Sequence, residues 1–364
     1  MKFIKEFIKN FIRARIRNLK YFKKRTYIEE SLTSSVLYFN NYIENKYKEN
    51  FINILDVGCF GQIPEYFVTL KNFNFYGIDI DTEEINRQKK YYKESQFNFF
   101  NYKVVEPDNL EKLRKDFVEP ALKKDRYVIE KVQSYHHNIS SSKLSNLNKN
   151  QSYTNNYFTE KKITIDDAVY NLINPKEINF LKIDIDSNDH EVLYGADNLL
   201  DNDNFFGLQI EVDFAKAKGV NYRNYIEVLR YMNSKNFNLL NFVNSKYSSE
   251  LLPTKYLYNF PGPNDNGSPL MGDLVFFKNF DDKFLEKLSE DDVIKILRLL
   301  EIYNQSHVAI ELINRTINFT EDNKKEFKSE LIKKYSLDFF GKVFHYDEYC
   351  KEYSKNKDHF INLI

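Results

Sequence analysis

The chain lacks several features that would assign it to a class at once. Its 364 residues include only two cysteines, and because Cys59 and Cys350 lie far apart they cannot form a disulfide framework. A reducing compartment, the cytoplasm, is therefore expected. Basic and acidic residues number 53 each, which gives a formal net charge of zero. Since no overall field attracts a polyanion, no nucleic acid partner is expected.

Long hydrophobic runs are also missing. From Met1 to Arg25 apolar residues recur at helical spacing with basic residues between them, and Glu6 is the one acid. This pattern is too interrupted to span a bilayer, and no cleavage site of a secretory signal follows it. The segment either makes peripheral contact with the inner face of a membrane or packs on the protein or on a second copy in a homo-oligomer. Packing is the commoner fate of amphipathic helices in folded chains.

Two short apolar segments, each with an acid at or next to its last residue, are the clearest positive signal. Residues 52–57 predict a buried strand that contains Asp56, and residues 73–79 predict a second strand that ends at Asp79. Gly58 and Gly61 follow the first strand, where a side chain would hold a ligand away from the backbone. A carboxylate at the end of the second strand can accept two hydrogen bonds from a ribose diol. Together these features predict a nucleotide-type pocket.

The turn after the first strand separates two kinds of cofactor. A dinucleotide fingerprint reads G-x-G-x-x-G, whereas residues 56–61 read D-x-G-x-x-G. The carboxylate of Asp56 would repel a pyrophosphate but not a cationic cofactor without phosphate, such as S-adenosylmethionine. An NAD-dependent sugar-modifying enzyme is the alternative, and the missing third glycine disfavours it.

Three further motifs narrow the class. They are Thr164-Ile165-Asp166-Asp167, interpreted as a strand, the strand Phe180-Leu181-Lys182-Ile183-Asp184, and the helix Glu191-Val192-Leu193-Tyr194-Gly195-Ala196. In this order they resemble the FkbM family of S-adenosylmethionine-dependent methyltransferases. The resemblance covers about residues 51–280. Ser187, where glycine is usual, and His190, where an apolar or aromatic residue is usual, depart from the family pattern.

The resemblance implies an α/β fold, a Rossmann-like class I methyltransferase sheet with helices on both faces. It places that domain at residues 51–280, between an N-terminal basic helical extension at 1–50 and a C-terminal helical region at 281–364. Within the domain, residues 272–278 resemble the family's final strand, expected at the edge of the sheet.

The resemblance also implies O-methylation of a hydroxyl, on a sugar of a glycan or of a glycosylated metabolite. Asp56, Gly58, Gly61 and Asp79 are assigned to the cofactor. A membrane-associated scaffold that keeps the fold without catalysis is an alternative from another class. A methyltransferase of nucleic acids is disfavoured because no N/D-P-P-Y signature is present.

Acidic residues cluster where the later strands end. Ligands of open parallel sheets bind beyond the carboxyl ends of the strands, so Asp184, Glu211 and Asp213 are expected to meet there. Carboxylate oxygens suit Mg²⁺, which could bind two sugar hydroxyls and activate one of them. Asp184 and Glu211 are predicted catalytic residues, and His190 is a candidate base because its ordinary pKa is near neutrality. A surface or packing role is the alternative for His190.

Several other acids and serines have local interpretations. Asp81 is predicted to cap the helix after the second strand, and Asp186 and Asp189 to cap or face the N-terminus of the next helix. Ser140 to Ser142 lie in a long Ser- and Asn-rich stretch that is either a substrate-side loop or a solvated linker.

Overall fold

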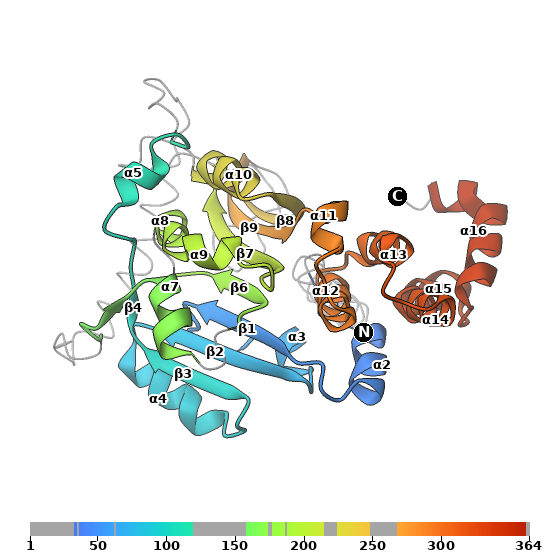
Figure 1. The fold of residues 1–364 in the computed structure, drawn as a ribbon, viewed down its shortest axis with the longest axis horizontal. Helices are drawn as coiled ribbons and strands as arrows, with labels where there is room; N and C mark the ends of the chain where they lie inside the picture. The colour runs from blue at the N-terminus through green and yellow to red at the C-terminus, as the bar shows by residue number, and fades with distance from the viewer. Residues whose placement is uncertain are drawn as a thin grey trace, which may run out of the picture.

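A mixed seven-stranded sheet forms the centre of the computed structural model (Figure 1). The structure describes residues 33–34, 36–61, 63–118, 158–173, 177–185, 188–214, 224–247 and 268–361. The strand order is β3-β2-β1-β6-β7-β9-β8. These strands are β1 (Ile52–Val57), β2 (Phe73–Asp79), β3 (Phe97–Asn101), β6 (Phe180–Ile183), β7 (Gly207–Asp213), β8 (Phe237–Tyr247) and β9 (Ser268–Lys278).

The strand pairing confirms the expected α/β Rossmann-like fold. Strands β3, β2, β1, β6 and β7 run parallel, and β9 pairs antiparallel with both β7 and β8. The expected edge position of residues 272–278 is wrong, because β9 lies between two partners and β8 forms the edge. The chain leaves β1 towards β2 on one side and returns to β6 on the other, so the sheet has its topological switch point between β1 and β6.

Helices cover both faces of the sheet, as expected for strands without a polar face. One core joins the inward residues of β1, β2 and β6, such as Ile54 and Phe180, to α2, α3, α4 and the C-terminal helices. The other joins the alternate residues, such as Leu55 and Leu181, to α7 through α10. These covering helices are α2 (Tyr38–Lys46), α3 (Glu65–Val68), α4 (Thr82–Tyr91), α5 (Leu110–Arg114), α7 (Ile165–Asp167), α8 (Asp189–Leu193), α9 (Asp197–Asp201), α10 (Asn224–Ser234), α11 (Asp282–Leu285) and α12 (Glu290–Ile302).

The C-terminal region forms helices from α11 onwards, and its first long helix belongs to the sheet's own core. Helix α12 begins with a capping box between Ser289 and Asp292. At its other end, the carboxylate of Glu301 accepts hydrogen bonds from the backbone of Phe39 and of Asn40, both at 2.8 Å. The remaining helices α13 (Ser306–Arg315), α14 (Glu321–Leu331), α15 (Lys333–Phe340) and α16 (Tyr346–Ile361) extend away from the sheet (Figure 1).

The T-x-D-D segment is not a strand. Residues 162 and 163 form the short strand β5 (Lys162–Ile163), which pairs with β4 (Lys103–Val104). Thr164 then starts α7, and its hydroxyl accepts a hydrogen bond from the backbone of Asp167 at 3.1 Å. Asp166 accepts the backbone N–H groups of Asn198 and Leu199, both at 2.9 Å. Free helix N–H groups attract such side chains, so this motif serves helix ends and not a sheet.

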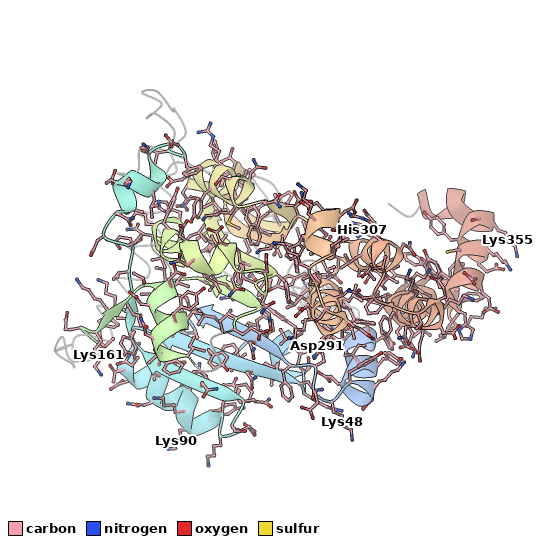
Figure 2. The ribbon with its side chains drawn as sticks, in the orientation of Figure 1. Lys48, Lys90, Lys161, Asp291, His307 and Lys355 are labelled. Atoms are coloured by element: carbon pink, nitrogen blue, oxygen red, sulfur yellow. The ribbon has the colours of Figure 1, made fainter. Side chains whose placement is uncertain are left out.

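The outer surface is charged, and Figure 2 shows Lys90 on α4 and Lys161 before β5 projecting from it. In the part of the chain that the structure describes, no helix is long and apolar enough to cross a membrane. The basic segment 1–25 and the serines at 140–142 lie outside the described residues.

Candidate functional site

The glycine turn at the end of β1 joins the two halves of the sheet. Gly58 has a φ of +89°, and a Cβ atom there would lie 1.8 Å from the backbone oxygen of Asp184 after β6. Its N–H donates to Ile78 on β2 at 2.9 Å, while the N–H of Asp184 donates to Val57 at 2.9 Å. Gly61 has a φ of +91°, but no described atom lies within 4 Å of a Cβ built there. The turn therefore has no space for a side chain at Gly58, where it packs against β6, but it has space beside Gly61.

Side chains of α4 hold this turn from the β2 side. Glu84 accepts a hydrogen bond from the N–H of Gly61 at 3.0 Å. Gln88 donates to the carbonyl oxygens of Cys59, at 3.2 Å, and of Gly61, and Arg87 also donates to Gly61. The sequence reasoning missed these residues. Their signal was the i, i+3 and i, i+4 spacing that puts all three on one side of the helix.

Asp79 ends β2 and is buried, with 8% of its surface exposed. Its Oδ1 accepts the backbone N–H of Asp81 at 2.7 Å. Burial raises the pKa of Asp79 to about 6, although the N–H of Asp81 opposes the shift. Asp81 itself caps α4, as predicted, by accepting the N–H of Glu84 at 2.9 Å. Asp79 is therefore free of the capping role and lies at the strand end where a ribose acceptor is expected.

Asp56 and Asp184 share a buried lysine. The Lys182 Nζ atom lies 2.9 Å from Oδ2 of Asp184 and 3.6 Å from Oδ1 of Asp56. Burial disfavours the ammonium, but attraction to the two carboxylates outweighs it and raises the pKa of Lys182. Asp56 is 2% exposed, and its Oδ1 has no hydrogen-bond donor among the described residues. The sequence reasoning missed Lys182, although Asp56 and Lys182 are register partners on adjacent strands.

The predicted magnesium ligands do not form a metal site. Asp184 is paired with Lys182, and Asp213 is held by Asn224, which accepts its N–H at 2.6 Å and donates to its Oδ2 at 3.2 Å. Glu211 lies on β7 opposite Asp273. Across the described ranges, no three His, Cys, Asp or Glu side chains are grouped to hold a metal ion. An ammonium already neutralises the nearest acids, so these residues do not fit a resident Mg²⁺.

His190 lies on α8 and is buried against α10. The side-chain oxygen of Asn224 accepts the backbone N–H of Asp213. The side-chain nitrogen of Asn224 therefore faces Nδ1 of His190, at 3.4 Å. Burial, assisted by the charge of Arg114, lowers the pKa of His190 to about 4. The structure thus makes His190 a neutral side chain whose Nδ1 faces a donor, connected through Asn224 to the end of β7.

We expect His190 to stay neutral across the physiological range. Because its pKa lies near 4, its imidazole NMR shifts should be constant from about pH 5.5 to 8, whereas a solvated histidine titrates near 6.5. A titration midpoint of His190 between about pH 6 and 7 would contradict the buried, neutral assignment.

The helix motif at residues 191–196 is largely structural. Glu191 accepts a hydrogen bond from Arg114 at 2.5 Å, and the same guanidinium donates two bonds to Glu227, at 2.8 and 2.9 Å. Tyr194 adds a hydroxyl bond to Glu227 at 3.1 Å. These bonds tie α5, α8 and α10 together beneath the strand ends.

Of the two acids predicted near the start of α8, the structure describes one. Asp189 accepts the backbone N–H of Ile185 at 2.7 Å and thereby fixes the loop after β6. Asp186 and Ser187 lie outside the described residues.

Comparison with known proteins gives one family and several solved structures. Residues 85–239 match the family model described as the methyltransferase FkbM domain. A search of curated proteins found no match. An FkbM methyltransferase from Methylobacillus flagellatus KT is 12% identical with a TM-score of 0.31, over 70% of this chain and 50% of that one. This chain thus spans half the length of that structure.

Two other solved structures are similar at the same level. A TehB-like SAM-dependent methyltransferase from Corynebacterium glutamicum ATCC 13032 Kitasato is 12% identical with a TM-score of 0.27, over 71% of this chain and 97% of that one. The plantazolicin methyltransferase BpumL, in complex with SAH, is 14% identical with a TM-score of 0.28, over 73% and 90% of the two chains.

Proposed function

The chain carries a methyltransferase FkbM domain at residues 85–239, and from this premise we propose that it transfers a methyl group from S-adenosylmethionine to a hydroxyl oxygen. The observation that carries the proposal is the carboxyl end of β1 and β2, where the N–H of Gly58 donates to Ile78, the residue before Asp79. There the backbone is open at Gly61, and a buried carboxylate ends the neighbouring strand. These are the two features that an adenosine needs, close backbone approach and an acceptor for its diol.

The described residues fit this cofactor. Asp79 would accept the hydroxyls of the ribose, and Gly61 leaves room beside the turn. Asp56 is buried and lies 3.6 Å from the ammonium of Lys182, so it adds negative charge beneath the turn, which disfavours a pyrophosphate there. When bound, the cofactor would supply an activated methyl group on its sulfonium, and the thioether would be the leaving group. The protein therefore does not need to form a covalent bond to the methyl group.

The protein's part is to align the acceptor hydroxyl and to take its proton. We assign this role to Asp184, which stands at the carboxyl end of β6 with 38% of its side chain exposed and is oriented by Lys182. Glu211, two residues before the end of β7, is assigned to acceptor binding. His190 is not retained as the base, because its Nδ1 faces the amide of Asn224 and its pKa is low.

We further propose that the acceptor is a sugar hydroxyl of a glycan or a glycosylated metabolite, as the family resemblance implies. Titration calorimetry with S-adenosylmethionine and with NAD tests the cofactor. Mass spectrometry of glycans from cells with and without the protein tests the acceptor, through a difference of one methyl unit. Binding of NAD without binding of S-adenosylmethionine would refute the assignment.

Asp79 should control cofactor affinity in a pH-dependent way. The ionised carboxylate accepts the diol, so affinity is greatest above about pH 6 and weakens as the pH falls below the pKa of Asp79. Because the ligand prefers the ionised form, binding below this pH should release a proton. Asp79→Ala should weaken binding by at least roughly 10- to 100-fold, because even one hydrogen bond to a charged acceptor contributes about 1.5–3 kcal/mol.

The matched control is Asp81→Asn. Asp81 lies two residues after Asp79, and asparagine can still cap helix α4. It should leave the affinity at neutral pH nearly unchanged and move the pH at which binding weakens only slightly downwards, because the charge of Asp81 contributes to the raised pKa of Asp79. Equal affinity of Asp79→Ala and the unaltered protein, measured by calorimetry, would remove Asp79 from the cofactor site.

A further inference from the structure

Lys182 occupies the position in which a shared cation would be expected between the acids of β1 and β6. We propose that Lys182 is a positioning residue, a fixed internal cation that holds the carboxylates of Asp56 and Asp184 in place of a divalent metal ion. The inference deepens the proposed function and rests on it for the identity of the cofactor. The carboxylates require a positive charge close to them. The sequence predicted a metal ion in that role, and the structure places the ammonium of Lys182 there.

The geometry of Lys182 supports a fixed position. The residue is only 9% exposed, and its neighbours Leu181 and Ile183 on β6 are fully buried on the opposite face. An ammonium is costly to bury unless it is paired. Its partners come from two segments, since Asp56 lies beside it on β1 in the parallel register and Asp184 directly follows β6. Moving the ammonium would leave two acids facing each other.

A polar network lies beside the lysine on the neighbouring strand, since Gln209 on β7 is the register partner of Lys182. The hydroxyl of Tyr303, which follows α12, donates to Gln209 at 3.0 Å, and Gln209 donates to Asp273 at 3.1 Å. Tyr303 is fully buried and stacks on Phe180, two residues before Lys182 on β6, with ring centroids 4.9 Å apart. The C-terminal region, beyond the residues that match the family model, therefore helps to fix the strand that carries Lys182.

The charge balance has a consequence for the cofactor. Without Lys182 the crevice would hold one more uncompensated negative charge, which would attract the sulfonium of S-adenosylmethionine. That attraction acts on the charged donor before transfer and is lost in the uncharged thioether product. Tighter binding of the charged donor before transfer would slow the reaction, because only interactions that are stronger in the transition state accelerate it. The positive charge of Lys182 limits this tighter binding of the donor.

The first experiment compares Lys182→Met with the unaltered protein by calorimetry, using S-adenosylmethionine and S-adenosylhomocysteine. We expect the affinity ratio of donor to product to shift towards the donor by about 3- to 10-fold, as one unit charge several ångströms away would produce. A purely structural role would change both affinities alike. Lys182→Arg should restore the original ratio.

The matched control is Lys295→Met. Lys295 is equally buried, at 9% exposure, and pairs with Asp291 at 3.0 Å on α12. Its removal should leave the ratio unchanged. An unchanged ratio in Lys182→Met, or an equal shift in Lys295→Met, would overturn the proposal.

The second experiment needs no cofactor. Terbium luminescence should reveal in Lys182→Ala a site at least about tenfold tighter than any in the unaltered protein, because two adjacent carboxylates without a counter-ion attract a hard cation. Addition of Asp184→Asn should abolish that site. If the unaltered protein already binds Tb³⁺ or Mg²⁺ through Asp184, the proposal is wrong, whether or not the lysine variants fold. Failure of the unaltered protein to bind S-adenosylmethionine would instead refute the proposed function and leave this experiment to decide on Lys182.

Discussion

Gly58→Ala should abolish most cofactor binding and destabilise the fold by about 3 kcal/mol or more. The new Cβ would lie 1.8 Å from the backbone oxygen of Asp184, at a φ of +89° that L side chains rarely adopt. The clash involves two backbones, so neither can yield by changing a rotamer. Relief requires the end of β1 to move away from β6, which separates Asp56 from Lys182. Chemical denaturation measures the stability, and calorimetry with S-adenosylmethionine measures the binding.

Gly61→Ala is the control within the same turn. Its φ of +91° carries the same backbone strain, but no described atom stands within 4 Å of the added Cβ. The stability loss should be limited to about 1–2 kcal/mol. The difference between the two variants then measures the contact between strands β1 and β6. Equal losses would show that this contact contributes nothing beyond strain.

Arg298→Met should lower the free energy of unfolding by about 3–5 kcal/mol, the usual loss when one member of a buried ion pair is removed. Arg298 is fully buried on α12 and lies 2.9 Å from Oε1 of Glu44 on α2. It also donates to the carbonyl oxygens of Asn50, at 2.5 Å, and of Asn72, at 3.2 Å. Burial lowers the pKa of Arg298 to about 10, so it remains charged at neutral pH. Methionine would leave the buried carboxylate of Glu44 without its counter-ion, although the N–H of Lys71 still donates to it at 2.7 Å, and would remove a donor from the carbonyl of Asn50.

Arg315→Met is the matched control, since Arg315 is partly exposed and pairs with an exposed Asp282 at 2.8 Å. Such surface pairs contribute about 0–1 kcal/mol. A second variant, Arg298→Met with Glu44→Leu, should recover part of the loss because it removes the unpaired carboxylate. Urea unfolding of the unaltered protein and of the three variants measures the free energy of unfolding of each. A loss below about 1 kcal/mol in Arg298→Met would show that this residue does not anchor α12.

Strands and the turn between them were predictable because their signals are local. The apolar runs at residues 52–57, 73–79 and 180–183 match the observed strands, since each is buried on both faces. The cap at Asp81 was predicted for the same reason, because a capping side chain acts on the backbone three residues away. By contrast, the T-x-D-D segment was interpreted as a strand, although Thr164 also caps a helix three residues away. Its other contact, from Asp166 to the backbone of Asn198 and Leu199, joins residues more than thirty positions apart and was not visible in the sequence.

Pairing across the sheet was not predictable in this way. The acids at the strand ends were found, yet the cation that neutralises two of them was overlooked, because Lys182 meets Asp56 only through the β1 to β6 register. The same is true of Arg298, which joins helix α12 to the segment before β1 across more than two hundred residues.

Short-range patterning determined the first two strands, the glycine turn and the acids that border it, because strand patterning, glycine freedom and capping act within a few residues. The α/β class was implied by the family resemblance of three further motifs. Tertiary contacts alone decided that Lys182 lies between two carboxylates, that His190 is buried and neutral, and that α12 covers the sheet. Charge and burial depend on which residues meet in space, and that is set by the register and packing of segments far apart in the chain.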